Sequence, residues 1–194
     1  MINDKTDFHR KKTMNKTRLI FNDATEIAGN KGIAILSLTD IDRTRQLSIV
    51  CERNIAIEIE RRKGPNPVSA TLLPEVAAEL LAKNTTSSFE ILFTDITDGQ
   101  YRAYVVNTDT LDYTPIRASD AILFSLVAKI PMFIDDNLMK RQSVAYDGRR
   151  TGVTVPINAI SMPMLEESLK KAIATEDYEM ASKLRDEIKK RKRD

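Results

Sequence analysis

Short apolar runs separated by polar turns dominate the first part of the chain. The run TRLIF at 17–21 predicts a strand, and the stretch GIAILSLTDIDRTRQLSIVC at 32–51 predicts two strands around the polar turn DIDRTR. The next stretch, ERNIAIEIERR at 52–62, fits two patterns. Its isoleucines alternate as in a strand, whereas its length and charged flanks allow a helix. We favour the helix, because a helix here would repeat an order of elements that recurs later in the chain.

A helix and a hairpin follow. The stretch LLPEVAAELLAKN at 72–84 predicts a helix, since Pro74 suits a first turn and Glu75 suits the positive end of the helix dipole. Residues 88–107 predict a hairpin. Two β-rich runs there flank the dipeptide Asp98-Gly99, which a type I′ turn favours because it needs positive φ angles.

Alternation of short elements continues to residue 143. The patterns predict a strand at 113–117, an apolar and therefore buried helix at 119–130, a strand at 131–134 and a short helix at 135–143. Ser119 is the expected N-cap of the apolar helix, with Asp120 in its first turn.

Two stretches resemble each other and bear on the fold class. SLTDIDRTRQLSIV at 37–50 and LFTDITDGQYRAYVV at 92–106 both run strand, Thr-Asp-Ile, polar turn, strand. This suggests a duplicated β-β-β-α unit, although two hairpins can look alike by chance. The expected fold class is α+β, with a mostly antiparallel sheet and packed helices.

The end of the chain predicts a helical hairpin. Two apolar faces at helical spacing flank Asp177, the expected cap of the second helix. Acidic residues precede basic ones by four positions, the favourable direction for ion pairs along a helix. The apolar faces are Leu165, Leu169, Ala172 and Ile173, then Met180, Ala181, Leu184 and Ile188; the pairs are Glu166–Lys170, Glu167–Lys171, Glu179–Lys183, Asp186–Lys190 and Glu187–Arg191. We expect a mobile polar tail at 1–16, a domain at 17–144, a connector at 145–160 and the hairpin at 161–194.

Charge and composition narrow the chemistry. The net charge is +2, yet residues 19–164 carry 15 Lys/Arg against 18 Asp/Glu, so binding of duplex DNA by counterion release alone is not expected. One cysteine, Cys51, excludes a disulfide within the chain, and one histidine, His9, excludes a Cys/His zinc site. No apolar run reaches the length of about 18 residues that a membrane span needs. We therefore expect a cytoplasmic protein without membrane contact.

The segment LEESLKKAIATEDYEMASKLRDEIKKRK at 165–192 resembles the UVR motif of excision-repair proteins and Clp-type protease partners. The resemblance implies that the hairpin contacts another protein, while a grip on nucleic acid and a purely stabilising cap stay open as alternatives. The partner-binding residues that it implies are Leu169, Ala172, Tyr178, Ala181, Leu184, Arg185 and Ile188.

The segments RQLSIV, IAIEIE, DGQYRA and IRASDAILFSLVAKIPMFI resemble the bifunctional nuclease family over about residues 17–140. The most specific block is Arg117 to Ala121. The resemblance implies an α+β fold, frequent oligomerisation and cleavage of both DNA and RNA. A family block of Arg-Pro-Thr-His-Asp is replaced here by SATLLPEV, which has no His, Asp or Arg.

Candidate site residues cluster around that block. Arg117, Ser119, Asp120 and Glu52 are the expected catalytic residues, although Arg117 is also spaced to pair with Asp120. Phosphodiester hydrolysis without histidine would most simply use Mg²⁺ or Mn²⁺ held by carboxylates. Asp120 and Glu52 are the expected metal ligands, and further carboxylates that could join them are Asp40, Asp42, Glu75 and Asp95.

Two functions follow from these patterns. The first is a metal-dependent nuclease that acts on DNA and RNA with little sequence preference. The alternative is a non-catalytic, homo-oligomeric interaction or regulatory module without a cofactor, which binds a DNA-repair or protease partner through residues 164–190. Carboxylates that converge in one cleft would favour the first, and dispersed carboxylates with an exposed apolar face on the hairpin would favour the second.

Overall fold

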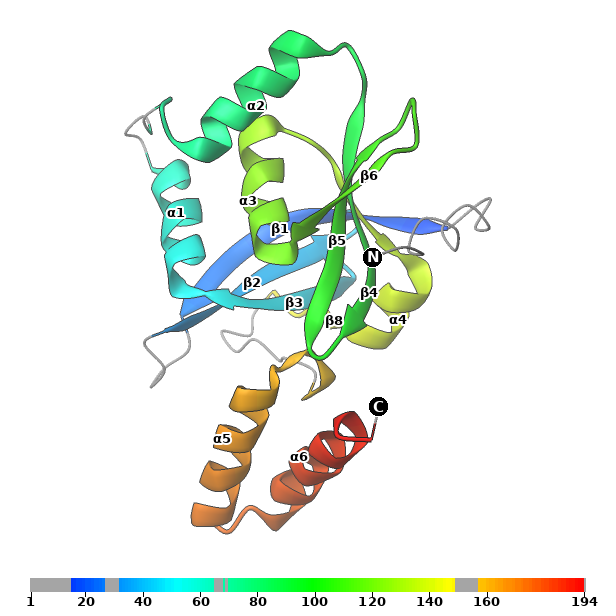
Figure 1. The fold of residues 1–194 in the computed structure, drawn as a ribbon. Helices are drawn as coiled ribbons and strands as arrows, with labels where there is room; N and C mark the ends of the chain where they lie inside the picture. The colour runs from blue at the N-terminus through cyan, green and yellow to red at the C-terminus, as the bar shows by residue number, and fades with distance from the viewer. Residues whose placement is uncertain (1–14, 27–31, 65–67, 69, 149–156, 194) are drawn as a thin grey trace.

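The computed structural model describes residues 15–26, 32–64, 68, 70–148 and 157–193 (Figure 1). Most of the predicted polar tail and half of the predicted connector lie outside these ranges. The strands are β1 (Lys16–Glu26), β2 (Ile33–Asp40), β3 (Arg45–Glu52), β4 (Phe89–Thr97), β5 (Gln100–Asn107), β6 (Tyr113–Arg117), β7 (Met132–Asp135) and β8 (Val144–Ala145). The helices are α1 (Arg53–Lys63), α2 (Leu73–Asn84), α3 (Ala118–Ala128), α4 (Asp136–Gln142), α5 (Met162–Ala174) and α6 (Tyr178–Arg191), with a 3-10 turn η2 (Ile157–Ala159).

All eight strands form one sheet in the order β6-β5-β4-β7-β1-β2-β3-β8. Strands β1–β3 and β4–β6 are two antiparallel meanders, and β7 joins them edge to edge. It pairs antiparallel with β1 and parallel with β4, where Ile91 lies opposite Met132. The predicted α+β class with a mostly antiparallel sheet is confirmed.

The core lies between the sheet and helices α1 and α3. The fully buried side chains include Leu36, Leu38, Leu47, Ile91, Phe93, Ile122 and Ile134. Helix α3 is apolar around most of its surface, as burial on several sides requires. It packs against strands of both meanders, β3 from the first and β4, β5 and β6 from the second. The helix thus fills the space between the two halves of the curved sheet (Figure 1).

Stretch 52–62 is helical from Arg53, as predicted, and packing explains why the isoleucine alternation did not produce a strand. Ile55 and Ile59 are buried four residues apart, on one face of α1, whereas Ile57 is 39% exposed. A strand would have placed all three side chains on one face. Burial therefore follows the helical period.

Two successive β-β-β-α runs are present, β1-β2-β3-α1 and β4-β5-β6-α3. The first strand of each run carries an irregularity in its pairing, at Phe21/Asp23 in β1 and at Phe93/Asp95 in β4. The two stretches that resemble each other in sequence are not equivalent, however. One forms the β2–β3 hairpin and the other β4–β5, so they occupy different places in their units.

Helix α3 begins one residue earlier than the sequence indicated. Its N-cap is Arg117, and no side chain caps the helix by a hydrogen bond, so the prediction of Ser119 as the N-cap is wrong. Strand β6 leads directly into the helix, because Arg117 keeps an extended backbone (φ −64°, ψ 134°). Ser119 therefore lies inside the first turn, where it is buried, and Asp120 occupies that turn as expected.

The C-terminal helices α5 and α6 form the predicted hairpin with a small core of their own. Asp177 caps α6 by accepting a hydrogen bond from the Met180 N–H at 3.0 Å. Three of the predicted ion pairs are present, while Glu166 instead lies 3.4 Å from Lys192 and Asp186 lies 3.1 Å from Arg185. None of the helices in the described ranges is both long enough and apolar enough to cross a membrane.

The β2–β3 turn is organised by the carboxylate of Asp40. It accepts hydrogen bonds from the N–H groups of Thr44 (2.7 Å) and Arg45 (2.9 Å) and from the Thr44 hydroxyl. Burial raises the pKa of Asp40, but these hydrogen bonds outweigh burial and leave the pKa below its ordinary value. Asp40 is therefore a structural residue that stabilises the β2–β3 turn.

We expect Asp40→Ala to lower the free energy of unfolding by about 1–2 kcal/mol, because two backbone N–H groups lose their acceptor. Asp40→Asn keeps an acceptor and should cost less. The folded protein binds this proton less tightly than the unfolded chain, so the carboxylate's contribution is full above about pH 4 and disappears as the pH falls through the lower folded pKa. Urea unfolding across acidic pH measures both effects. Equal stability of all three proteins at neutral pH would contradict this role.

Candidate active site

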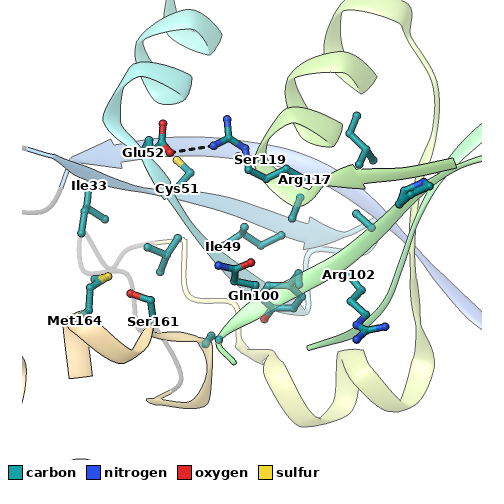
Figure 2. Close-up of a pocket in the computed structure, with 18 of the residues that line it drawn as sticks. Ile33, Ile49, Cys51, Glu52, Gln100, Arg102, Arg117, Ser119, Ser161 and Met164 are labelled. Atoms are coloured by element: carbon teal, nitrogen blue, oxygen red, sulfur yellow. Dashed lines mark hydrogen bonds and ion pairs between the residues drawn. The ribbon is translucent and has the colours of Figure 1, made fainter. Parts of the chain in front are cut away.

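A cleft of about 820 Å³ opens where β3 and β6 end and α1 and α3 begin (Figure 2). Its walls come from three places in the chain. The end of β3 contributes Ile49 to Glu52, the β4–β5 turn and β5 contribute Gly99 to Tyr104, and the β6–α3 junction contributes Pro115 to Ser119. Ile33 of β2 and three residues near the start of the C-terminal hairpin, Ala159, Ser161 and Met164, complete the lining.

Arg117 and Glu52 line this cleft, and Asp120 binds Arg117 beside it. Arg117 donates from Nε to Asp120 Oδ2 at 2.9 Å and from Nη2 to Asp120 Oδ1 at 3.1 Å. Its remaining terminal nitrogen, Nη1, donates to Glu52 Oε1 at 3.0 Å, the contact drawn in Figure 2. The side chains are partly solvated, with exposed fractions of 52% for Arg117, 40% for Asp120 and 63% for Glu52.

Equivalent positions in the two β-β-β-α units supply this contact. Glu52 is the N-cap of α1 and Arg117 is the N-cap of α3, so each stands where a third strand turns into a helix. The pair joins residues 65 positions apart in the chain. The fold of both units is therefore needed to bring the three side chains together.

The neighbouring carboxylates stabilise the charged form of the Arg117 guanidinium. The hydrogen bond to Asp120 is the largest cause that raises the pKa of Arg117; burial opposes it, and Glu52 adds to the rise. One cation and two anions give the trio a formal charge of −1. Three of the five N–H donors of Arg117 are engaged, so an incoming phosphate competes with the carboxylates for this side chain. Glu52 is the easier one to replace, because it holds the guanidinium through one hydrogen bond while Asp120 holds it through two.

Comparison with known protein families matches residues 36–147 to the bifunctional nuclease domain. The chain belongs to the bifunctional nuclease domain family. The matched segment runs from within β2 to just beyond β8 and contains Glu52, Arg117, Ser119 and Asp120. It ends before η2 and the C-terminal helices, so the UVR resemblance of the hairpin stays a prediction. A search of curated proteins finds no match.

A family member of this kind has a nuclease-like or nucleic-acid-binding role. Of the residues predicted for it, Ser119 lines the cleft but is buried at 5% exposure. Cys51 also lines the cleft, and burial raises the pKa of its thiol to about 11, so it stays protonated at neutral pH. The charged side chains that line the cleft are Glu52, Arg102 and Arg117, and Asp120 holds Arg117 from beside the cleft.

The carboxylates proposed from sequence as further metal ligands do not join this trio. Asp40 is held in the β2–β3 turn, Glu75 pairs with Arg62 at 2.8 and 2.9 Å, and Asp95 lies 3.7 Å from Arg141. In the ranges that the structure describes, no three His, Cys, Asp or Glu side chains gather where they could hold a metal ion. Two carboxylates that share one guanidinium do not fit a Mg²⁺ or Mn²⁺ site built from several acids.

The predicted partner-binding residues divide into two groups. Ala172, Ala181, Leu184 and Ile188 are buried between α5 and α6, and Leu169 packs against them. Tyr178 and Arg185 face solvent. Docking on the intact hairpin could therefore use the last two directly, while the other five hold the hairpin together.

No pattern in the sequence indicated that residues 159–164 line the cleft. The connector has no apolar periodicity, yet Ala159 reaches the core of the domain and Ser161 and Met164 reach the cleft. Gly99 makes the approach possible. Its φ is +76°, and a Cβ there would lie 2.4 Å from the carbonyl oxygen of Ile160.

Arg191 secures the same segment from the other side by donating to the carbonyl oxygen of Ile160 at 2.7 Å. The backbone around Ile160 is thus held between the β4–β5 turn and the end of α6.

We expect Gly99→Ala to lower stability by about 1–3 kcal/mol and to loosen the segment 157–164, because the new methyl group collides with backbone at a strained φ. Hydrogen exchange of that segment and thermal unfolding measure the two effects. Gly64→Ala is the matched control, since Gly64 has a φ of −70° and its Cβ would meet its nearest neighbour at 3.5 Å. Similar exchange in both variants would show that the Gly99 contact does not hold the segment.

Proposed function

We propose that this chain cleaves phosphodiester bonds in DNA and RNA with little sequence preference, in the cleft at the heads of α1 and α3. The observation that carries the proposal is Arg117 at the cleft mouth, held by Asp120 and Glu52 inside the segment that matches the bifunctional nuclease domain. Guanidinium groups bind phosphate through paired N–H donors, and Arg117 stays protonated at every physiological pH.

The proposed chemistry starts with an exchange on Arg117. A phosphate oxygen takes the Nη1 donor from Glu52, while Asp120 keeps its two hydrogen bonds and fixes the plane of the guanidinium. The released Glu52 carboxylate accepts a proton from water as the water oxygen attacks phosphorus. The bond from phosphorus to the leaving oxygen breaks, and that oxygen takes a proton from solvent. Arg117 offsets the negative charge that builds up on the phosphoryl oxygens.

The described side chains do not form a site suited to Mg²⁺ or Mn²⁺. Asp120 and Glu52 are the residues that would hold a cation, and each already binds Arg117. The proposed hydrolysis therefore uses Arg117, Asp120, Glu52 and water. Cleavage assays with added Mg²⁺, added Mn²⁺ and EDTA decide this point separately from the roles of the three side chains.

We expect Glu52→Gln to lower kcat by about 10²–10⁴-fold, the usual contribution of a general base. Arg117→Ala and Asp120→Asn should lower kcat/KM with the fold intact, because exposed ion pairs contribute only about 0–1 kcal/mol to stability. Initial rates on labelled single-stranded DNA, duplex DNA and RNA give these values.

The control is Glu60→Gln, which removes an exposed α1 carboxylate that pairs with Lys63. Activity that persists in all three site variants would point to a contaminating nuclease and would refute the site. Loss of activity in Glu60→Gln as well would show that surface charge, and not the cleft, is responsible.

A second function is supported by exposed apolar side chains. Tyr178, at the tip of the hairpin, is 69% exposed, and Ile173 and Met180 beside it are also exposed. Helix α2 has no buried residue, and Leu73 at its start is 79% exposed. Apolar surface of this kind favours contact with other chains. In this second candidate the hairpin tip docks on a repair or protease partner in the manner of a UVR motif, and α2 contacts a second copy.

For the docking function we expect a Tyr178→Ala, Met180→Ser double variant to lose a partner that the wild-type chain retains, with little change in its melting temperature. Affinity purification from the producing cells, with the retained proteins identified by mass spectrometry, makes the comparison. Lys183→Ala serves as the control, since it removes an exposed α6 side chain that pairs with Glu179. Retention of the same partner by the double variant would rule out the tip as the docking surface.

A further inference from the structure

A second hollow lies beside the cleft and shares two residues with it. This hollow has a volume of about 320 Å³ and lies between strands β4 and β5 and helix α4. Arg102 and Tyr104 line both the hollow and the cleft, so β5 forms a ridge between them. The other lining residues of the second hollow are Thr94, Asp95, Asp135, Asn137 and Arg141.

Arg102 and Arg117 lie opposite each other on neighbouring strands but differ in their side-chain partners. In the β5–β6 ladder Arg102 lies opposite Arg117, but only Arg117 has carboxylate partners. The Arg102 side chain is exposed and has no hydrogen bond or ion pair within the described residues. Figure 2 shows its side chain pointing away from Glu52 and Arg117, toward the side on which α4 lies. On its other side Arg102 lies opposite Asp95 of β4, but Asp95 lies 3.7 Å from Arg141 and forms no ion pair with Arg102, so the Arg102 donors can take an anion.

Two tyrosines extend the ridge beyond Arg102. Tyr104 follows Arg102 by two positions, so it lies on the same face of β5, about 6.6–6.8 Å further along the strand. The ring of Tyr104 meets the ring of Tyr113 edge to face, with centroids 5.9 Å apart. Tyr113 is 38% exposed. Tyr101, by contrast, is buried in the core and offers no ring surface here.

The acidic groups of the second hollow are already engaged. Asp135 caps α4 by accepting hydrogen bonds from the N–H groups of Asn137 and Leu138, both at 3.0 Å. Asp95 accepts from the Ile96 N–H at 2.8 Å and lies 3.7 Å from Arg141. The open donors on the ridge therefore belong to Arg102, with Arg141 at the far wall of the hollow.

We propose that this ridge binds an unpaired nucleotide of a single-stranded DNA or RNA substrate, with Arg102 on its phosphate and Tyr104 and Tyr113 against its base. This inference rests on the proposed nuclease function and names the substrate class of the same site. A flexible single strand can place one phosphate at Arg117 and a neighbouring one at Arg102. Stacking on the tyrosines needs a base that is free of its complement and tolerates any base type.

The experiment is binding of a labelled single-stranded oligonucleotide with phosphorothioate linkages, measured by fluorescence anisotropy at several salt concentrations. We expect Arg102→Ala to weaken binding about fivefold or more and to reduce the slope of log K against log salt by about 0.7, the value for one phosphate contact to a single strand. We expect Tyr104→Ala to weaken binding of the single strand about fivefold or more. Duplex affinity should change little in the Tyr104→Ala variant.

Arg61→Ala is the matched control, because it removes one exposed positive charge from α1 that pairs with Glu58. Equal losses in Arg61→Ala and Arg102→Ala, or an unchanged salt slope in Arg102→Ala, would overturn the inference. Cleavage that still depends on Arg117 and Glu52 in that case would leave the proposed function standing. Failure of the wild-type chain to bind the single strand would also overturn the inference. Cleavage of duplex DNA would then be the remaining test of the proposed nuclease function.

Discussion

The structure depends on the pairing of the short strand β7 with both meanders. Met132 to Asp135 pair antiparallel with β1 on one side, and Met132 to Ile134 pair parallel with β4 on the other. Ile134 is fully buried there. Without this strand the two β-β-β-α units would have no shared sheet. With it, α3 packs against strands of both units, and the helix starts of α1 and α3 come to the mouth of the same cleft.

The candidate site is a consequence of that junction. Glu52 and Arg117 are separate N-cap residues in sequence, and each would be an ordinary solvated charge in an isolated unit. In the folded chain, Glu52 and Asp120 leave Arg117 with three of its five N–H donors bound to carboxylates. An anion that approaches the site must therefore compete with these carboxylates. Arg102 lies opposite Arg117 in the β5–β6 ladder, and its side chain has no ion pair within the described residues. In the proposed function, Arg117 binds phosphate by exchanging partners, and Arg102 attracts the nucleic-acid strand.

Local signals in the sequence predicted most elements of the fold. Turn residues, helical spacing and the Arg117–Asp120 spacing depend on neighbours in the chain, and the corresponding strands, helices and ion pair are present. What depends on distant segments was not predictable: the parallel β4–β7 pairing, the approach of Ile160 to Gly99 and the ridge at Arg102. Ser119 was misassigned because β6 enters α3 without a loop, and the carboxylates proposed for a metal were scattered because turns and ion pairs use them locally.

The most direct test of the central claim is a crystal structure of the chain with a short phosphorothioate single strand. The account predicts a phosphoryl oxygen within hydrogen-bond distance of Arg117 Nη1, with Glu52 released toward a water molecule and both hydrogen bonds to Asp120 kept. An oligonucleotide bound away from the cleft, with the contact between Arg117 and Glu52 unchanged, would contradict it.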